Sequence, residues 1–288
     1  LRGESGLQTG LFYFLKLKLA TMENWQRQSV LLFDEMQISE GLDYCRRLDQ
    51  SFRASKKVQV VLLKGIIASW KHICYYDFGT MMAKNLLLSI ISKCEQNNSV
   101  VRAIACDMGN GRLLKELNVY SEQKHFFESP VDHTRKIYII PDPPHCLKNL
   151  RNHCLDYDLV IKADGKQVYL TKKHFIDLLR KDCEDLKHCY KLSPKHIECK
   201  ENERQNVRLA AQLFSDTVSK YFTFLSDEFK EQADIIKIVD SWFDTVNSRV
   251  KYDWKPNRCG LGKALTKSYS YFSHIILFYR VFGKKTFQ

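Results

Sequence analysis

The sequence predicts an α/β fold, in which a mixed five-stranded sheet with helices comes first and a mostly α-helical region follows. Three observations lead to this prediction. Short apolar runs of strand length recur as far as Pro141, and segments with helical spacing separate the later ones. After Asp156 nearly all apolar patterns have the helical period. We therefore expect an N-terminal helical segment at 1–27, an α/β domain at 28–156 and a helical domain at 157–288.

The composition favours a folded, basic protein. Of its 288 residues 44% are hydrophobic, which is enough for a packed core and argues against global disorder. The formal net charge of +12 favours polyanionic partners, nucleic acid first. No apolar run reaches the length that crosses a bilayer, so no membrane partner is expected. The chain opens with neither an initiator Met nor a signal-peptide pattern, so we expect a fragment of a longer protein.

The ten cysteines are scattered singly through the chain. None forms a CxxC pair, which argues against a zinc ribbon or finger. This use of cysteine is typical of a reducing, intracellular compartment. A weaker alternative is a metal site built from Cys183, His188, Cys189, His196 and Cys199.

The first predicted strand, 29–33, is an apolar run that leads into two acids, Asp34 and Glu35. A carboxylate on a strand buried on both faces is unfavourable unless it is compensated, and a divalent cation is the usual compensation. The alternative is that Asp34 only begins the turn at the end of the strand. Glu35 points to the opposite side of the strand, so we do not expect it to be a ligand.

The next strands suggest where a partner for Asp34 lies. Strands at 58–63 and 70–76 follow one another without a helical segment, which favours an antiparallel meander. A helix over 82–94 then leads to a strand at 100–106, which also ends on an acid, Asp107.

Chain topology predicts that the two acids meet. The right-handed crossover rule lets the fourth strand lie parallel beside the first, so Asp34 and Asp107 stand at the same end of adjacent strands. That is the ribonuclease-H-like arrangement, in which paired acids hold two divalent metals that activate a nucleophile and stabilise a leaving oxygen. A fifth strand at 135–140 precedes a helix from about Pro144, for which Asp142 is suited as the N-cap.

The second half is predicted to be mostly helical, with one strand-like stretch at 167–170. Amphipathic helices are expected at 172–181, 207–225, 235–246 and 264–282.

Five segments carry a resemblance to a known family. The chain resembles P-element-type transposases, including the THAP-domain transposase-like proteins of animals. Individually the segments are short, but they occur in family order and extend from about residue 10 to the C-terminus. They are LLFDEM at 31–36, ACDMG at 105–109, PDPPHCLKNLRN at 141–152, VRLAAQLFS at 207–215 and WFDTVNSR at 242–249.

The resemblance implies a fold and an activity. In the family, a ribonuclease-H-like catalytic domain is interrupted by a helical insertion that binds guanine nucleotide (GTP), and two aspartates and a glutamate catalyse cut-and-paste DNA transposition in the nucleus. It places the aspartates on Asp34 and Asp107, which would be the ligands of Mg²⁺ or Mn²⁺, with transposon ends and target DNA as partners. Asp142 is expected to be structural. The third acid's LxQDxxE segment and the THAP zinc module do not occur in this chain, so we expect it to be inactive alone.

The resemblance also implies a nucleotide site in the second half. A carboxylate suits guanine because it accepts from both N1–H and the 2-amino group, which adenine lacks. Phe243 is either a stacking residue or a core aromatic. The run 182–185 departs from the NKxD pattern of guanine specificity, and Asn206 stands where a lysine is expected. The implied nucleotide-binding residues are Asp185, Lys191, Val207, Ser215, Phe243, Asp244 and Asn247.

Three functions therefore remain open from the sequence. The first is a transposase core without cleavage activity of its own. The second is a domesticated, non-catalytic protein that binds DNA or a protein partner. The third is a guanine-nucleotide switch built on the helical half. Self-association into a homo-oligomer is compatible with each of them.

Overall fold

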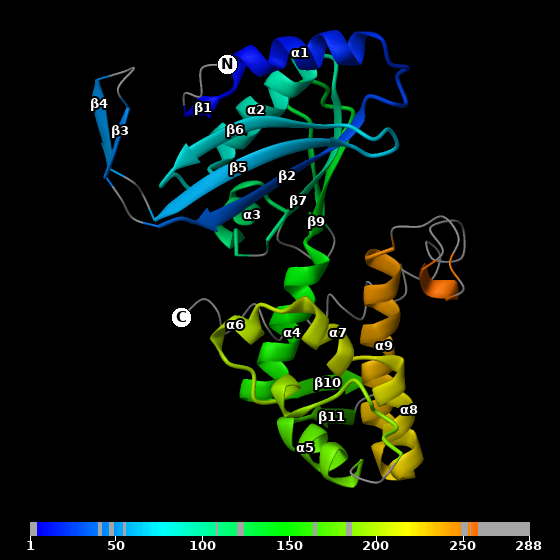
Figure 1. The fold of residues 1–288 in the computed structure, drawn as a ribbon. Helices are drawn as coiled ribbons and strands as arrows, with labels where there is room; N and C mark the ends of the chain where they lie inside the picture. Colours follow the sequence, from blue (N-terminus) through cyan, green and yellow to red (C-terminus); the bar gives the residue numbers. More distant parts are fainter. Residues whose placement is uncertain are drawn as a thin grey trace. The chain divides into compact units, whose positions relative to one another are not determined.

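The computed structural model describes residues 5–39, 42–45, 49–53, 56–107, 109–119, 124–163, 166–182, 186–248, 253 and 255–258 (Figure 1). The chain divides into two compact units, Leu1–Asp142 and Pro143–Gln288. The division comes before helix α4 (Pro143–Tyr157), earlier than the boundary expected near residue 156, because Leu147 and Cys154 of α4 belong to the core of the second unit. No helix among the described residues is long and apolar enough to cross a membrane.

The first unit contains a seven-stranded sheet in the order β1-β6-β5-β2-β7-β9-β8. All five expected strands are present, and the short edge strands β1 and β8 are additional. Their sequences are too short to give a period-two pattern, so the sequence could not reveal them. The strands are β1 (Gly6–Leu7), β2 (Gln28–Gln37), β5 (Lys57–Gly65), β6 (Lys71–Phe78), β7 (Val100–Cys106), β8 (Phe126–Glu128) and β9 (Lys136–Pro141).

The strand pairing agrees with the predicted topology. Strands β2, β5 and β6 form the antiparallel meander. The crossover through helix α2 (Lys84–Gln96) then brings β7 parallel to β2, with Phe33 opposite Cys106 in the register. Strand β9 lies parallel to β7 on its other side. A separate antiparallel hairpin, β3 (Leu42–Cys45) with β4 (Gln50–Arg53), lies between β2 and β5 in the sequence and was not predicted.

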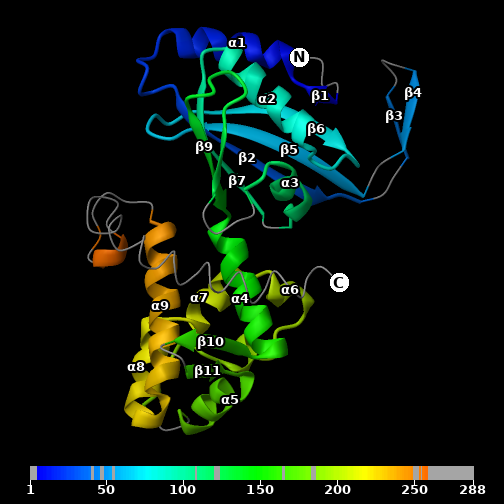
Figure 2. The same cartoon turned by 180° about the vertical axis from the view of Figure 1, so that it is seen from behind.

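One face of the sheet carries the core of the first unit. Leu31 and Phe33 are buried on that face, together with Ile104 of β7. Helices α1 (Thr9–Ala20) and α2 lie on the same side of the sheet in both views (Figures 1 and 2). Phe12, Leu15 and Leu19 of α1 belong to this core, as do Leu113 and Leu114 of α3 (Gly111–Glu116), so the N-terminal helix is an integral part of the first unit.

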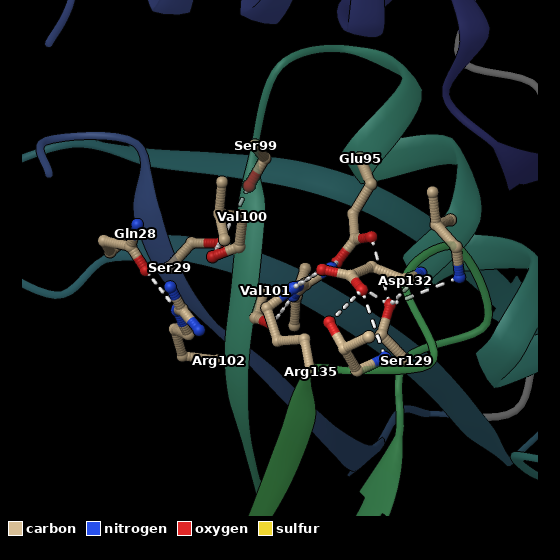
Figure 3. Close-up of polar contacts among 12 residues, drawn as sticks. Gln28, Ser29, Glu95, Ser99, Val100, Val101, Arg102, Ser129, Asp132 and Arg135 are labelled. Carbon is tan, nitrogen blue, oxygen red and sulfur yellow. Dashed lines mark hydrogen bonds and ion pairs between the residues drawn. The ribbon is translucent and has the colours of Figure 1, made fainter. Parts of the chain in front are cut away.

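A buried polar cluster lies at the amino-terminal end of β7 (Figure 3). Arg135 pairs with Glu95 at 2.6 Å, and their side chains are 11% and 5% exposed. Arg135 also donates to the carbonyl of Val101 at 2.5 Å, and Ser129 donates to Glu95 at 3.2 Å. These partners satisfy one another and lie at the end of β7 opposite to Asp107. We therefore interpret the cluster as a structural lock between α2 and the β8–β9 hairpin.

The second unit is mostly helical around one core, as expected. The predicted long helix over 207–225 is two helices, because Ser215 adopts an extended conformation (φ −95°, ψ 155°) at the N-cap of the second. The expected helix at 264–282 lies outside the described residues. After α4 the elements are the hairpin β10 (Leu159–Ala163) and β11 (Lys166–Leu170), α5 (Lys172–Lys181), η1 (Pro194–His196), α6 (Glu201–Arg204), α7 (Val207–Leu213), α8 (Asp216–Leu225), η2 (Asp227–Phe229), α9 (Lys230–Val246) and η3 (Pro256–Arg258).

Arg151 of α4 anchors the turn that precedes α7. Its side chain is fully buried and donates to the backbone carbonyls of Glu203, Arg204 and Asn206 at 2.5–3.3 Å. Carbonyls at the end of a helix have no partner within the helix and carry partial negative charge, which suits a guanidinium. Asn206 in turn caps α7, because its side chain accepts from two backbone N–H groups of that helix.

Candidate functional sites

The first candidate site is the pair of aspartates at the carboxyl ends of β2 and β7. Because Phe33 and Cys106 are opposite each other in a parallel pair, Asp34 and Asp107 are the next residues on neighbouring strands. Leu31, Phe33 and Cys106 are buried in the core, so the side-chain alternation directs both acids to the other face of the sheet. Asp34 is exposed and Asp107 is partly exposed.

Backbone N–H groups orient both carboxylates. Oδ1 of Asp34 accepts from the backbone N–H of Glu35 at 2.8 Å, and Oδ1 of Asp107 accepts from Gly109 at 3.4 Å. The side chain of Glu35 instead pairs with Lys57 at 2.8 Å.

Asp142 follows β9, at the same end of the parallel strands as Asp34 and Asp107. Pro141 is opposite Cys106, and the backbone N–H of Asp142 donates to the carbonyl of Cys106 at 3.1 Å. Yet within the described part of the chain no group of three or more His, Cys, Asp or Glu side chains is placed to hold a metal. The candidate metal site remains the predicted pair of Asp34 and Asp107. The alternative cysteine–histidine site finds no support in the described residues either, since the His196 ring bonds to Ser193 and Gln212.

Two carboxylates suit Mg²⁺ or Mn²⁺. Magnesium is commonly bound through one or two carboxylates, with water completing its octahedral shell. The exposed end of a sheet gives room for that water and for a phosphate. The residues present thus fit the first metal of the expected pair.

The second candidate site lies where the N-terminus of α8 meets the C-terminal half of α9. The carboxylate of Asp240 accepts a backbone hydrogen bond from Asp216, the residue after Ser215. Asp240 lies one helical turn before Asp244, so the expected nucleotide residues Ser215 and Asp244 belong to the same region. Val207 at the start of α7 packs against the same core as α9.

Asp244 is enclosed by two cations. The residue is 6% exposed. Its Oδ1 accepts from Nε and Nη2 of Arg258 at 2.7 and 2.6 Å, and its Oδ2 accepts from Nζ of Lys255 at 3.0 Å. The hydrogen bond to Asp244 raises the pKa of Arg258, while burial and the neighbouring Asp244 charge raise the pKa of Asp240 to about 6.

The remaining predicted nucleotide residues are less closely associated. Phe243 is half-buried against the core and contacts Trp242, with ring centroids 6.1 Å apart. Asn247 is exposed, and its backbone N–H donates to the carbonyl of Phe243. Lys191 is exposed, with Nζ 5.2 Å from the ring centroid of Tyr190. Asp185 lies outside the described residues.

Lys255 and Arg258 could not be predicted as partners of Asp244, because the sequence holds no signal that pairs a cation with a particular acid more than ten residues away. Arg151 lay in a segment that resembles the family, but its carbonyl contacts depend on the fold of α6 and could not be read from the motif.

Comparisons with known proteins agree with both halves of the chain. A family model described as "TNP-like, RNase H N-terminal domain" matches residues 3–117, and one described as "TNP-like, GTP-binding insertion domain" matches residues 144–258. The chain is 34% identical over 230 residues to the "Transposable element P transposase" of Drosophila melanogaster, which covers 77% of this chain and 30% of that protein.

A solved structure is also similar. The "Drosophila P element transposase strand transfer complex" matches with a TM-score of 0.84 and 29% sequence identity, over 95% of this chain and 62% of that chain. The chain therefore spans less than two thirds of the length of either relative. These matches confirm the expected fold class, a ribonuclease-H-like α/β half followed by a helical insertion.

Proposed function

Since this chain belongs to the P-element-type transposases, we propose that it supplies the first two catalytic acids and a guanine-nucleotide site to a DNA transposase. The observation that carries the proposal is the parallel register of β2 and β7, which sets Asp34 and Asp107 side by side on the exposed face of the sheet. The substrate would be transposon-end and target DNA, and the place of action the nucleus.

The protein's own contribution is to hold two negative charges together where DNA can approach. Two carboxylates repel a phosphodiester, so they favour DNA only when a cation lies between them and the phosphate. When bound, Mg²⁺ or Mn²⁺ would polarise the phosphate and generate the attacking nucleophile. The chain's positive net charge would attract DNA, with binding that weakens as salt rises.

A manganese titration followed by electron paramagnetic resonance tests the acid pair. We expect the wild-type chain to bind Mn²⁺ and Asp34→Asn and Asp107→Asn each to weaken binding at least tenfold. Glu35→Gln is the matched control, because it removes an adjacent carboxylate that faces away from the pair, and it should bind Mn²⁺ like the wild type. Equal binding by all four proteins would refute the assignment.

We expect this chain not to excise a transposon end by itself. With two carboxylates, the second metal would lack a ligand that the family's glutamate supplies. Excision of a labelled transposon end by the purified chain with Mg²⁺ or Mn²⁺ would show this expectation to be wrong.

For the nucleotide site, we propose that Asp244 accepts from N1–H and the 2-amino group of guanine. Support comes from the matched GTP-binding insertion domain and from the burial of this carboxylate one helical turn after Asp240, which accepts a hydrogen bond from the N-terminus of α8. Buried polar groups discriminate strongly against ligands that leave them unpaired. Calorimetry should therefore show GTP binding to the wild type, much weaker ATP binding, and loss of GTP binding in Asp244→Ala.

A second candidate function is that of a non-catalytic binding protein. The face that carries the acid pair also has apolar side chains that the described residues leave exposed, among them Ile73, Tyr138 and Ile140. Such a surface suits a protein partner, including a second copy of the chain. DNA or partner binding unchanged by Asp34→Ala together with Asp107→Ala would favour this function over catalysis.

A further inference from the structure

The two cations on Asp244 create a conflict with the proposed guanine site. A guanine base presents two N–H donors to a carboxylate and so needs both of its oxygens. In this structure Arg258 occupies Oδ1 and Lys255 occupies Oδ2. Arg258 fills both acceptor positions of Oδ1, so guanine cannot pair with both oxygens of Asp244 until Arg258 is displaced, and Lys255 competes with guanine for Oδ2.

Lys255 and Arg258 belong to a short segment that follows α9. The backbone N–H of Lys255 bonds to Asp253 at 2.9 Å, and the hydroxyl of Ser248 donates to the carbonyl of Arg258. The side chains of Lys255 and Arg258 are 28% and 44% exposed, whereas that of Asp244 is 6% exposed. The two cationic side chains thus lie on the solvent side of the carboxylate. They can leave Asp244 by changing rotamer and becoming hydrated.

We propose that Lys255 and Arg258 form a displaceable clasp on Asp244, which guanine must open in order to bind. The inference rests on the proposed guanine site and adds its regulation. The clasp compensates the charge of a buried carboxylate while the site has no nucleotide. Only molecules with an open clasp can bind guanine, so the apparent affinity equals the intrinsic affinity multiplied by the fraction of open molecules. It also sharpens selectivity, because a base that offers no N–H pair to Asp244 cannot replace the two cations.

The clasp predicts an inverse response to mutation. Removing cations from a nucleotide-binding protein ordinarily weakens binding, but removing these two should strengthen binding of the neutral nucleoside guanosine. Guanosine is the suitable probe because it has no phosphate that the released side chains could bind. Two partly exposed ion pairs contribute on the order of 1.4 kcal/mol together, which corresponds to about tenfold in affinity.

The experiment is calorimetry with guanosine at pH 8, above the raised pKa of about 6 at Asp240. The double variant Lys255→Met/Arg258→Gln should bind guanosine about tenfold more tightly than the wild type. Lys173→Met/Arg180→Gln on α5 is the matched control, with the same change in charge and no expected change in affinity. Adding Asp244→Ala to the clasp variant should abolish the gain, and adenosine should show no gain.

Salt gives a second measurement that needs no variant. Salt screens ion pairs and so weakens the closed clasp. The affinity of the wild type for guanosine should therefore rise roughly two- to threefold between 50 and 500 mM NaCl. The affinity of the clasp variant should stay constant. Equal or weaker guanosine binding by the clasp variant, or no salt effect in the wild type, would overturn the clasp and leave the guanine site standing. If neither protein binds guanosine or GTP, the proposed guanine site itself is wrong, and the clasp falls with it.

Discussion

The acids of the two units differ in how the protein surrounds them. Asp34 and Asp107 lie at the exposed carboxyl ends of two strands, and their carboxylates accept hydrogen bonds from backbone N–H groups. Asp244 is buried and paired with two cations. Strand register alone creates the first site, whereas the second depends on contacts from a following segment. An open site can be filled from solution, while an enclosed one must first exchange its own partners.

The largest effect is expected at Arg151, the most enclosed charged side chain among the described residues of the second unit. Arg151→Ala should lower the free energy of unfolding by about 3–4 kcal/mol, because it removes the guanidinium bonds to three backbone carbonyls and opens a cavity. Arg151→Lys should cost less, since an ammonium can keep part of these bonds. Denaturant unfolding measures both, and a loss below about 1 kcal/mol for the alanine variant would contradict the anchoring role.

A smaller effect is expected for Asp244→Ala, which should lower stability by about 2 kcal/mol. Truncating a buried ion pair usually costs more, but solvent reaches both cationic partners and reduces the loss. Asp216→Ala is the comparison, because its exposed pair with Lys220 should contribute well under 1 kcal/mol. If thermal unfolding shows the same loss of stability in Asp244→Ala and Asp216→Ala, the distinction between enclosed and open acids does not hold.

The contrast also explains how much the sequence could predict. Hydrophobic runs, the acids that end them and the crossover rule were enough to predict five strands, the pairing of the first four and the adjacency of Asp34 and Asp107. The neighbour of the fifth strand was not predicted. The edge strands were missed because their stability comes from neighbours rather than from their own pattern. The break at Ser215 was missed because apolar residues on both sides continue the helical period. The partners of Asp244 and Arg151 were missed because they come from other segments, and spacing does not encode them.

Asp240 adds a pH dependence to the enclosed site. Burial and the Asp244 charge raise its pKa to about 6, above the ordinary value of 3.8, so the folded protein favours the protonated form. Lys255 opposes this shift, and Asp216 contributes both a repelling charge and a backbone donor. Stability attributable to Asp240 is therefore fully present below about pH 4 and is lost as the pH rises from there through about 6.

Asp240→Asn should accordingly raise stability at neutral pH by on the order of 1 kcal/mol, after allowance for its partial exposure. The amide can still accept from the backbone of Asp216, which keeps the change conservative. Wild-type and variant unfolding free energies should coincide near pH 4 and separate toward pH 7.5. A difference that stays constant over this range would show that Asp240 does not titrate differently in the folded and unfolded states.

The smallest effect is expected at the open site. Asp34→Asn and Asp107→Asn should each change the free energy of unfolding by less than about 0.5 kcal/mol without metal, since both side chains reach solvent and an amide oxygen can accept the same backbone N–H groups. In saturating Mn²⁺ the wild type should gain stability and the variants should not, because a ligand that binds only the folded state shifts the unfolding equilibrium. Thermal melts with and without Mn²⁺ measure this gain. A large loss without metal would mean that these acids are part of the fold, and the distinction between an open and an enclosed site would no longer hold.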